Sequence, residues 1–350
     1  MSRNRLGRFF AVTAAGTALA LGLAACGGSS DTATDAGAEA TAEATEEAVA
    51  EETMEEAAAS DCASNTVAII TVDPANPYWK AQVDTAVAEA EALGYQTTVN
   101  AHGNDADQQN QFIDAAISAG VCAIILDPAG ADESVGAVQK ATDAGIPVFQ
   151  VNAEIAEQGI AKAQIVSNNA QGAALGAQAW VECMGDNRDY VELFGNPTDN
   201  NAGIRSTSYH EVIDPLGFNM LQQEVANWDR QEGKQKMELM IQAHPDLQGV
   251  IAGNDEMALG AIEALRDAGK LEGVCVLGFD GNDDARDAVI AGEMVATVLQ
   301  PIVPATQLAV EQMHTYLTTG EAPAEEKQSI DCILITQENA GNLNGFVLSS

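Results

Sequence analysis

Polar and aromatic side chains recur directly after the apolar segments that we expect to form strands. In the first half of the chain, Asn76, Tyr78 and Trp79 follow one such segment, and Asp127 and Asn152 follow two others. Ligands of open parallel sheets bind outside the carboxyl ends of the strands, so these residues are candidate ligand contacts. The sequence therefore predicts half of a binding site at one edge of a sheet.

The second half of the chain repeats this arrangement. Its candidate contacts are Arg205, Trp228, Asn254, Asp280 and Gln300. Carboxylate, carboxamide and guanidinium groups hydrogen-bond to neighbouring hydroxyls, and aromatic rings cover the C–H face of a polyhydroxylated ligand. We therefore expect a sugar or a sugar alcohol rather than a phosphate or a peptide. Taken singly, each residue has a structural alternative, because Asp and Asn often cap helices and Trp often packs in a core. Other polar residues at these strand ends, which we do not select, are Asp73, Asn196, Asp199, Asn200, Asp229 and Asp255.

The elements that must position these residues alternate along the chain. From Thr66 onward, short apolar segments rich in β-branched residues alternate with alanine-rich helical stretches. A fully apolar segment such as residues 123–126 suits a parallel sheet that helices cover on both faces. The alternation restarts near residue 170, which predicts an α/β fold of two Rossmann-like lobes, each with a parallel sheet.

The composition excludes several classes of protein. The chain of 350 residues has 52 Asp and Glu against 15 Lys and Arg, a formal net charge of −37. Binding to nucleic acid needs clustered positive charge, so we expect no nucleic-acid partner. A mean hydropathy of −0.05 excludes a protein with many membrane spans, and six cysteines are too few for a disulfide scaffold.

The first 25 residues have the layout of a secretory signal peptide. Arg3, Arg5 and Arg8 form a basic start, residues 9–23 are apolar, and small residues precede Cys26. This ending is similar to a bacterial lipobox, in which the cysteine is lipidated and becomes the mature N-terminus. An uncleaved membrane anchor is the alternative, although the apolar run is short for a span. Both interpretations predict an extracytoplasmic protein held at the cell membrane.

An acidic linker follows at residues 26–63. Positions 26–61 contain eleven acidic side chains, no basic side chain and no aromatic one. Such a composition buries too little apolar surface to offset the entropy of ordering the chain. We therefore expect a disordered tether between Cys26 and the folded part.

Several motifs carry a family resemblance. Asn76-Pro77-Tyr78-Trp79 is similar to the family's opening motif, and further motifs lie at 243–248, 253–261, 278–281 and 296–300. With these motifs the chain resembles the periplasmic ribose-binding proteins of bacterial ABC importers, which have the type I periplasmic binding protein fold. The resemblance covers residues 66–334.

The resemblance implies two lobes that are joined by a three-strand hinge and close on a ligand between them. It places the first lobe at residues 64–153 plus 301–328, and the second at residues 154–300 plus 329–350. The ten selected residues would contact the ligand. The implied function is that of a monomeric solute-binding protein without catalysis, cofactor or metal. It would deliver a monosaccharide or a four- to five-carbon sugar alcohol to an ABC permease.

One position departs from the ribose-binding pattern. Ribose binders carry an Asp-Arg pair where this chain has Asn152-Ala153. The change removes a bidentate donor and turns a charged acceptor into a mixed donor and acceptor, although Asp127 can supply a carboxylate nearby. A site built for particular hydroxyls rejects analogues that lack them, so the specificity should differ. Ribose, a related pentose and a small polyol therefore all stay open as ligands.

Other functions and sites have weaker support. A receptor of the same fold could pass a sugar or an autoinducer to a chemotaxis or sensor-kinase pathway. A glycosidase would need Asp127 and Asp280 as its two carboxylates, and a transcriptional regulator conflicts with the export signal. The histidines lack metal-ligand spacing, and residues 280–284 lack the terminal glutamate of a calcium loop. We also expect a disulfide between Cys62 and Cys122, because both precede strands at one end of the first sheet.

Overall fold

The computed structural model describes residues 64–349 of the chain. The predicted signal peptide, the lipidation site Cys26, the acidic linker and Cys62 lie outside these residues. Within residues 64–349 no helix combines the length and the apolar character needed to cross a membrane.

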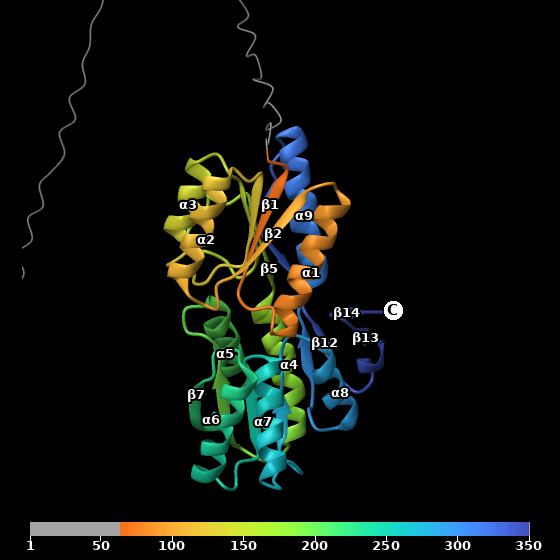
Figure 1. Cartoon of the computed structure of the whole chain (residues 1–350). Coiled ribbons are helices and arrows are strands. Elements are labelled where there is room, and N and C mark those ends of the chain that lie inside the picture. The colour runs from red at the N-terminus through yellow and green to blue at the C-terminus, as the bar shows by residue number, and fades with distance from the viewer. Residues whose placement is uncertain (1–63, 350) are drawn as a thin grey trace, which may run out of the picture. The chain divides into compact units, whose positions relative to one another are not determined.

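A parallel sheet and four helices form the first lobe. The strands are β1 (Thr66–Thr71), β2 (Gln96–Ala101), β3 (Ala123–Leu126), β4 (Val148–Asn152), β5 (Ala163–Ser167) and β11 (Lys327–Ile330). The helices are α1 (Pro77–Ala92), α2 (Ala106–Ala119), α3 (Val135–Asp143) and α9 (Ile302–Thr319). The strand order is β11-β5-β4-β3-β1-β2, and every pair is parallel. Helices α2 and α3 cover one face and α1 and α9 the other (Figure 1), which explains why β3 is apolar throughout.

The second lobe repeats this architecture on a smaller sheet. Its strands are β6 (Asp189–Phe194), β7 (Asn219–Val225), β8 (Gly249–Ala252) and β9 (Cys275–Leu277), in the parallel order β7-β6-β8-β9. Its helices are α4 (Asn169–Met184), α5 (Asn200–Ile213), α6 (Arg230–Ala243), α7 (Asp255–Asp267) and α8 (Asp283–Ala291). The short elements are η1 (Asp214–Leu216), β10 (Thr297–Leu299), β12 (Ile333–Ile335), η2 (Ala340–Asn342), β13 (Leu343–Asn344) and β14 (Val347–Leu348).

Local sequence signals set the ends of the helices. Helix α2 begins after Asp105, whose side chain accepts a hydrogen bond from the backbone N–H of Gln108 at 3.0 Å. It ends at Gly120, which has a φ of 62°. This left-handed conformation favours glycine, so an Asp before and a Gly after the stretch delimit the helix in the sequence.

The chain passes between the lobes three times. The crossings follow β5, β10 and β11, and β10 pairs antiparallel with β12 beside them. The structure corrects the predicted first boundary, after residue 153, because β5 pairs with β4 in the first sheet. Residues 154–162 fold back on the first lobe, where the Ala156 N–H donates to the carbonyl of Ala131. Of the other two predicted boundaries, the one after residue 300 follows β10, and the one after residue 328 falls inside β11.

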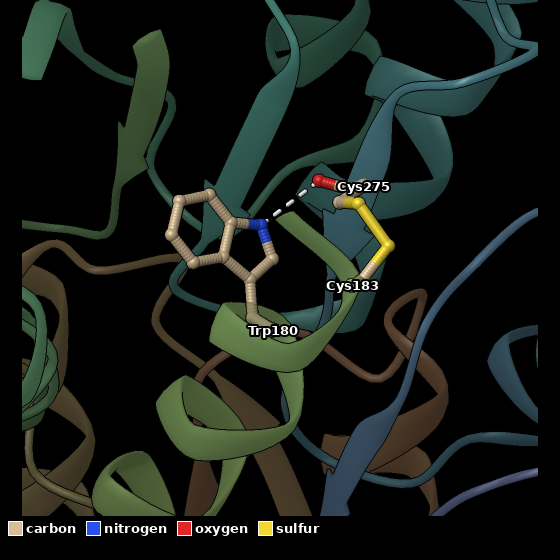
Figure 2. Close-up of a disulfide and its surroundings, with 3 residues drawn as sticks. All are labelled: Trp180, Cys183 and Cys275. Atoms are coloured by element: carbon tan, nitrogen blue, oxygen red, sulfur yellow. Dashed lines mark hydrogen bonds between the residues drawn. A yellow bond between two sulfur atoms is a disulfide. The ribbon is translucent and has the colours of Figure 1, made fainter. Parts of the chain in front are cut away.

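A disulfide joins the end of α4 to the start of β9 in the second lobe. Cys183 and Cys275 are 92 positions apart in the sequence. Figure 2 shows the indole of Trp180 beside this bridge, with its N–H donating to the carbonyl of Cys275 at 2.9 Å. Cys122 is also disulfide-bonded, and its pairing with Cys62 stays a prediction. Cys332 is a buried free cysteine.

Candidate ligand site between the lobes

A small cavity lies where the strand ends of the two lobes face each other. Its volume is about 20 Å³, and its lining comprises Asn76, Tyr78, Trp79, Asn152, Asp199, Arg205, Trp228, Asn254, Asp280 and Gln300. Nine of the ten residues that we selected from the sequence are in this set, and Asp199 replaces Asp127. Most of the lining is inaccessible to solvent, with Arg205 and Asp280 each 3% exposed. A ligand can therefore reach the cavity only if the lobes separate.

A polar cluster on the side of the first lobe joins Tyr78, Asn152 and Gln300. The Tyr78 hydroxyl lies 3.0 Å from Oδ1 of Asn152 and 3.2 Å from Oε1 of Gln300. The amide of Gln300 in turn donates to Oδ1 of Asp280 at 2.7 Å. Because Gln300 follows β10 at a crossing between the lobes, this cluster connects the two halves of the site through the hinge.

Arg205 and Asp280 form the charged part of the second lobe's wall. Nη1 of Arg205 lies 3.5 Å from Oδ1 of Asp280, and it donates to the carbonyl of Gly253 at 2.8 Å. Nε of Arg205 donates to Oδ1 of Asn169 at 2.7 Å, and the guanidinium carbon lies 4.0 Å from the ring centre of Phe279. These contacts hold Arg205, on the second turn of α5, turned inward.

Burial raises the pKa of the Asp280 carboxyl, and the positive charge of Arg205 opposes that shift. The backbone of Asp280 has a φ of 133°, in a region that residues with side chains rarely adopt. Strained residues of this kind persist where the surrounding structure holds them, and they concentrate in ligand sites. The strain is therefore consistent with a binding role for this carboxylate.

Trp228 fills the space between the lobes because glycines leave room for its ring. A Cβ atom on Gly195 would overlap the indole, and one on Gly253 would lie 3.0 Å from it. The guanidinium carbon of Arg205 is 5.2 Å from the centre of the same ring. The ring is thus held by a glycine surface and a cation, in an arrangement that suits an aromatic platform for a sugar.

Three of the lining residues also cap helices, so each of these side chains serves both a helix end and the cavity wall. The side chains of Asn76, Asp199 and Asn254 accept hydrogen bonds from backbone N–H groups in the first turns of α1, α5 and α7. The amides of Asn76 and Asn254 keep their N–H donors, and both lie within reach of the Trp228 carbonyl, at 3.5 and 3.2 Å. Capping therefore orients these amides without using up their donors.

Asp127 lies behind the cavity and does not line it, contrary to the prediction from the sequence. It is 2% exposed and accepts hydrogen bonds from the side chains of Asn152 and Gln82. Burial raises its pKa to about 8, and the N–H donors of Asn152 and Gln82 oppose the shift. Of Asp127 and Asp280, the two carboxylates that a glycosidase would need by the sequence analysis, only Asp280 lines the cavity.

Two indole N–H groups of the cavity wall have no hydrogen-bond partner among the described residues. They are Nε1 of Trp79 and Nε1 of Trp228, and both are buried. Burial raises the pKa values of the Asp127 and Asp199 carboxyls, and the N–H groups of Trp79 and Trp228, which lie near them, oppose the shift. Each N–H group thus lies close to a carboxyl without completing a hydrogen bond of good geometry, and a buried donor without a full partner is costly. They are therefore candidate donors to a ligand.

Other hollows lie around the molecule. An open groove of about 400 Å³ shares Asn76, Trp79 and Trp228 with the cavity, and forms the outer part of the cleft. A larger groove of about 900 Å³ lies beside Cys183 and Cys275, and none of the selected residues lines it. Within residues 64–349 no group of acidic, histidine or cysteine side chains is arranged to hold a metal ion. The enclosed cavity is therefore the candidate site.

Comparison with known proteins gives consistent relatives. A family model described as a periplasmic binding protein domain matches residues 67–322. A D-apiose import binding protein from Paraburkholderia graminis is 51% identical over 287 residues, which cover 82% of this chain and 92% of that protein. The ribose import binding protein RbsB from Escherichia coli is 33% identical over 244 residues, covering 69% of this chain and 81% of that protein.

Solved structures show the same fold. An ABC transporter solute-binding protein from Bacillus halodurans, with bound myo-inositol, has a TM-score of 0.75 and 26% identity, and the match covers 81% of this chain and 98% of that one. The arabinose-binding component from Shewanella, bound to L-arabinofuranose, has a TM-score of 0.74 and 25% identity, with 79% and 93% covered. The predicted fold class is confirmed, and the family comprises binding proteins rather than enzymes. The chain belongs to the periplasmic binding protein family, as a type I sugar-binding protein of ABC importers.

Proposed function

We propose that this extracytoplasmic solute-binding protein captures D-apiose, a branched five-carbon aldose, and delivers it to an ABC permease. The observation that carries the proposal is the chemistry of the lining between the lobes, where amides, carboxylates, one guanidinium and two indoles converge, because these groups suit the hydroxyls and the C–H face of a small sugar. Two relatives named as D-apiose import binding proteins are 51% and 50% identical to this chain, against 33% for a ribose-binding relative. The Asn152-Ala153 departure from the ribose-binding pattern supports the same preference.

Binding uses the lining residues as two facing sets. Carboxylate and amide oxygens accept from sugar hydroxyls, while Arg205 and the two indole N–H groups donate to sugar oxygens. Because each set is incomplete alone, the ligand favours the closed arrangement of the lobes. Asn76, Tyr78, Trp79 and Asn152 contact the sugar from the first lobe, Asp199, Arg205, Trp228, Asn254 and Asp280 from the second, and Gln300 from the hinge.

The protein acts at the cell membrane as a monomer with a lipid anchor. Cleavage of the signal peptide before Cys26 and lipidation of that cysteine would place the acidic linker between the membrane and the first lobe. The proposal rests on the basic, apolar and small-residue order of the first 26 positions. Mass spectrometry of the N-terminal peptide tests it, and an unmodified Cys26 in the mature chain would contradict it.

A ligand screen by thermal unfolding tests the proposed sugar. The purified chain is heated with D-apiose, D-ribose, L-arabinose or myo-inositol in turn. Ligand at about a hundredfold over its dissociation constant stabilises a fold by about 2.7 kcal/mol. We expect D-apiose to give the largest rise in the unfolding temperature. If only another sugar stabilises the protein, that sugar replaces D-apiose as the proposed ligand.

The variant Asp280→Ala shows whether binding occurs in this cavity. It removes the acceptor of Gln300 and the partner of Arg205, and we expect a loss of about 2–4 kcal/mol in binding. Unchanged affinity in a folded Asp280→Ala protein would move the site elsewhere.

A further inference from the structure

Asp127 has contacts that suit a positioning role in ligand recognition, although it does not line the cavity. Its two carboxylate oxygens accept hydrogen bonds from the amide nitrogen of Asn152, at 3.2 and 2.9 Å. The amide nitrogen of Gln82 donates to Oδ2 at 3.1 Å. Gln82 is itself oriented, because the hydroxyl of Thr71 donates to its Oε1 at 2.7 Å. The carboxylate is therefore surrounded by donors whose directions are fixed.

The orientation of Asn152 follows from this arrangement. An amide can present either its oxygen or its nitrogen to a neighbour, and the hydrogen-bond network decides which. Since the nitrogen of Asn152 faces Asp127, its Oδ1 faces the Tyr78 hydroxyl in the cavity wall. The Asn152 backbone has a φ of 79°, so the end of β4 adopts a conformation that few residue types tolerate.

A second amide faces Tyr78 in the same way. Gln300 donates its nitrogen to Asp280, so its Oε1 also points to the Tyr78 hydroxyl. That hydroxyl has a single proton, and the two amide oxygens lie 3.0 and 3.2 Å from it. One oxygen at a time is therefore left without this donor, and a ligand hydroxyl can supply the missing proton.

We propose that Asp127 is a positioning residue for specificity, which holds Asn152 with its oxygen toward Tyr78 and so selects a ligand that places a hydroxyl donor there. This inference rests on the proposed function, because it concerns the same sugar site. It goes further by assigning the donor and acceptor pattern of the first lobe to a residue that the ligand does not touch.

The variant Asp127→Asn tests the proposal. One carboxylate oxygen becomes an N–H₂ group, which meets the nitrogen of Asn152 as donor against donor and favours a flipped Asn152. The measurement is calorimetric titration at about pH 9, above the pKa of about 8 of Asp127 so that this group is ionised, with the sugar that binds in the thermal screen and with its monodeoxy analogues. We expect the wild type to bind one analogue about tenfold or more weakly than it binds the parent sugar. For Asp127→Asn, we expect the same analogue to bind less than about threefold more weakly than the parent sugar.

A compensating exchange separates positioning from general damage. In the double variant Gln82→Glu with Asp127→Asn, position 82 becomes the acceptor, so the new amide can donate to it and turn its oxygen back to Asn152. Thr71 can still donate to the carboxylate at position 82. We expect the double variant to recover the discrimination against the deoxy analogue. Failure to recover it in a folded double variant would overturn the proposal, as would wild-type discrimination in Asp127→Asn.

Asp255→Asn is the matched control. Asp255 is another fully buried carboxylate outside the cavity lining, and it accepts from Thr297 and from the backbone of Gly281 and Asn282. It lies in the second lobe and makes no hydrogen bond to Asn152. We expect Asp255→Asn to lower the affinity for the parent sugar and for its deoxy analogues by the same factor. The discrimination against the deoxy analogue should therefore stay as in the wild type.

A measurement without ligand keeps the two proposals distinguishable. If no sugar binds the wild type, the proposed function fails, and the exchange of the Asn152 side-chain amide protons with solvent then decides the positioning role. We expect slow exchange by NMR in the wild type and the double variant, and fast exchange in Asp127→Asn. Equal exchange rates in all three proteins would overturn the positioning role by itself.

Discussion

The side-chain amide of Asn76 in the first lobe donates to the backbone carbonyl of Trp228 in the second lobe, across 3.5 Å. A second bridge between the lobes joins Thr198 to the backbone of Ala129 and Ala131, with both hydrogen bonds at 3.3 Å. These hydrogen bonds are long, so each contributes little to closure. A shorter hydrogen bond, from the Asn200 amide to Oε1 of Glu154 at 2.9 Å, also joins the lobes, and a bound sugar would add to these contacts.

Replacing Asn76 by Asp should open the cleft. The carboxylate can still cap α1 by accepting from the Tyr78 N–H, but it has no donor for the Trp228 carbonyl and repels that oxygen. Without ligand, we expect a larger radius of gyration than that of the wild type by small-angle X-ray scattering. The free energy of sugar binding should be less favourable than in the wild type by about 1 kcal/mol. Asn254→Asp is the control, because it removes a donor to the same carbonyl within the second lobe. Equal radii in the two variants would contradict the prediction.

Gly195→Ala should displace the aromatic platform. The added Cβ would overlap the Trp228 ring, so the indole must move into the cavity or out of the cleft. We expect sugar affinity to fall by about tenfold or more, since a contact face is lost. Gly203→Ala on α5 is a matched control, because a Cβ there meets nothing within 4 Å. A loss of affinity of the same size in both variants would show that the Trp228 ring is not the cause.

His210 should make the stability of the second lobe depend on pH. Its two ring nitrogens lie 3.0 Å from Glu192 and 3.0 Å from Asp214. The hydrogen bond to Glu192, with a smaller contribution from Asp214, raises the pKa of His210 to about 9 against burial. The folded state therefore holds the proton more tightly than the unfolded state does. This stabilisation is complete below the ordinary His pKa of about 6.5 and is lost as the pH rises through about 9.

The measurement is the free energy of unfolding between about pH 6 and 10, compared between the wild type and His210→Gln. We expect the difference between the two proteins to shrink as the pH rises through about 9. A difference that stays constant over this range would rule out the protonated imidazole as its source.

Removing the disulfide should weaken the fold and leave sugar binding intact. The bridge joins Cys183 and Cys275, which are 92 positions apart, and a closed loop of this length restricts the unfolded chain strongly. We expect the double variant Cys183→Ala with Cys275→Ala to lose about 2–4 kcal/mol in the free energy of unfolding. Its sugar affinity should match the wild type below the unfolding transition, because the bridge lies at the amino end of β9. A parallel loss of affinity would show that the bridge also shapes the cavity.

Buried, apolar strands are easier to predict from this sequence than strands that are short or polar. The run at β3 is recognisable because helices cover both of its faces. Strand β5 is not, since its Ala163–Ser167 segment contains two polar residues and follows a polar loop. Its burial comes from pairing with β4 and β11, and that partnership is a property of the tertiary structure.

The site is predictable to the level of the strand ends, and no further. Position after a strand identifies residues at the correct edge of the sheet, which explains why Asn152 and Arg205 reach the cavity. It does not say which way a side chain turns. Asp127 turns toward Gln82 and away from the cavity, whereas Asp199 caps α5 and still lines it. Both outcomes depend on neighbours from distant parts of the chain.

The placement of the three tryptophans has an optical consequence. Trp79 and Trp228 stand on opposite lobes and are 7% and 4% exposed, while Trp180 is fully buried in the second lobe. Separation of the lobes would bring water to two indoles and leave the third as a constant background. The emission spectrum of the unlabelled protein should therefore shift to the red on opening and back on closure, giving the chain its own fluorescent reporter.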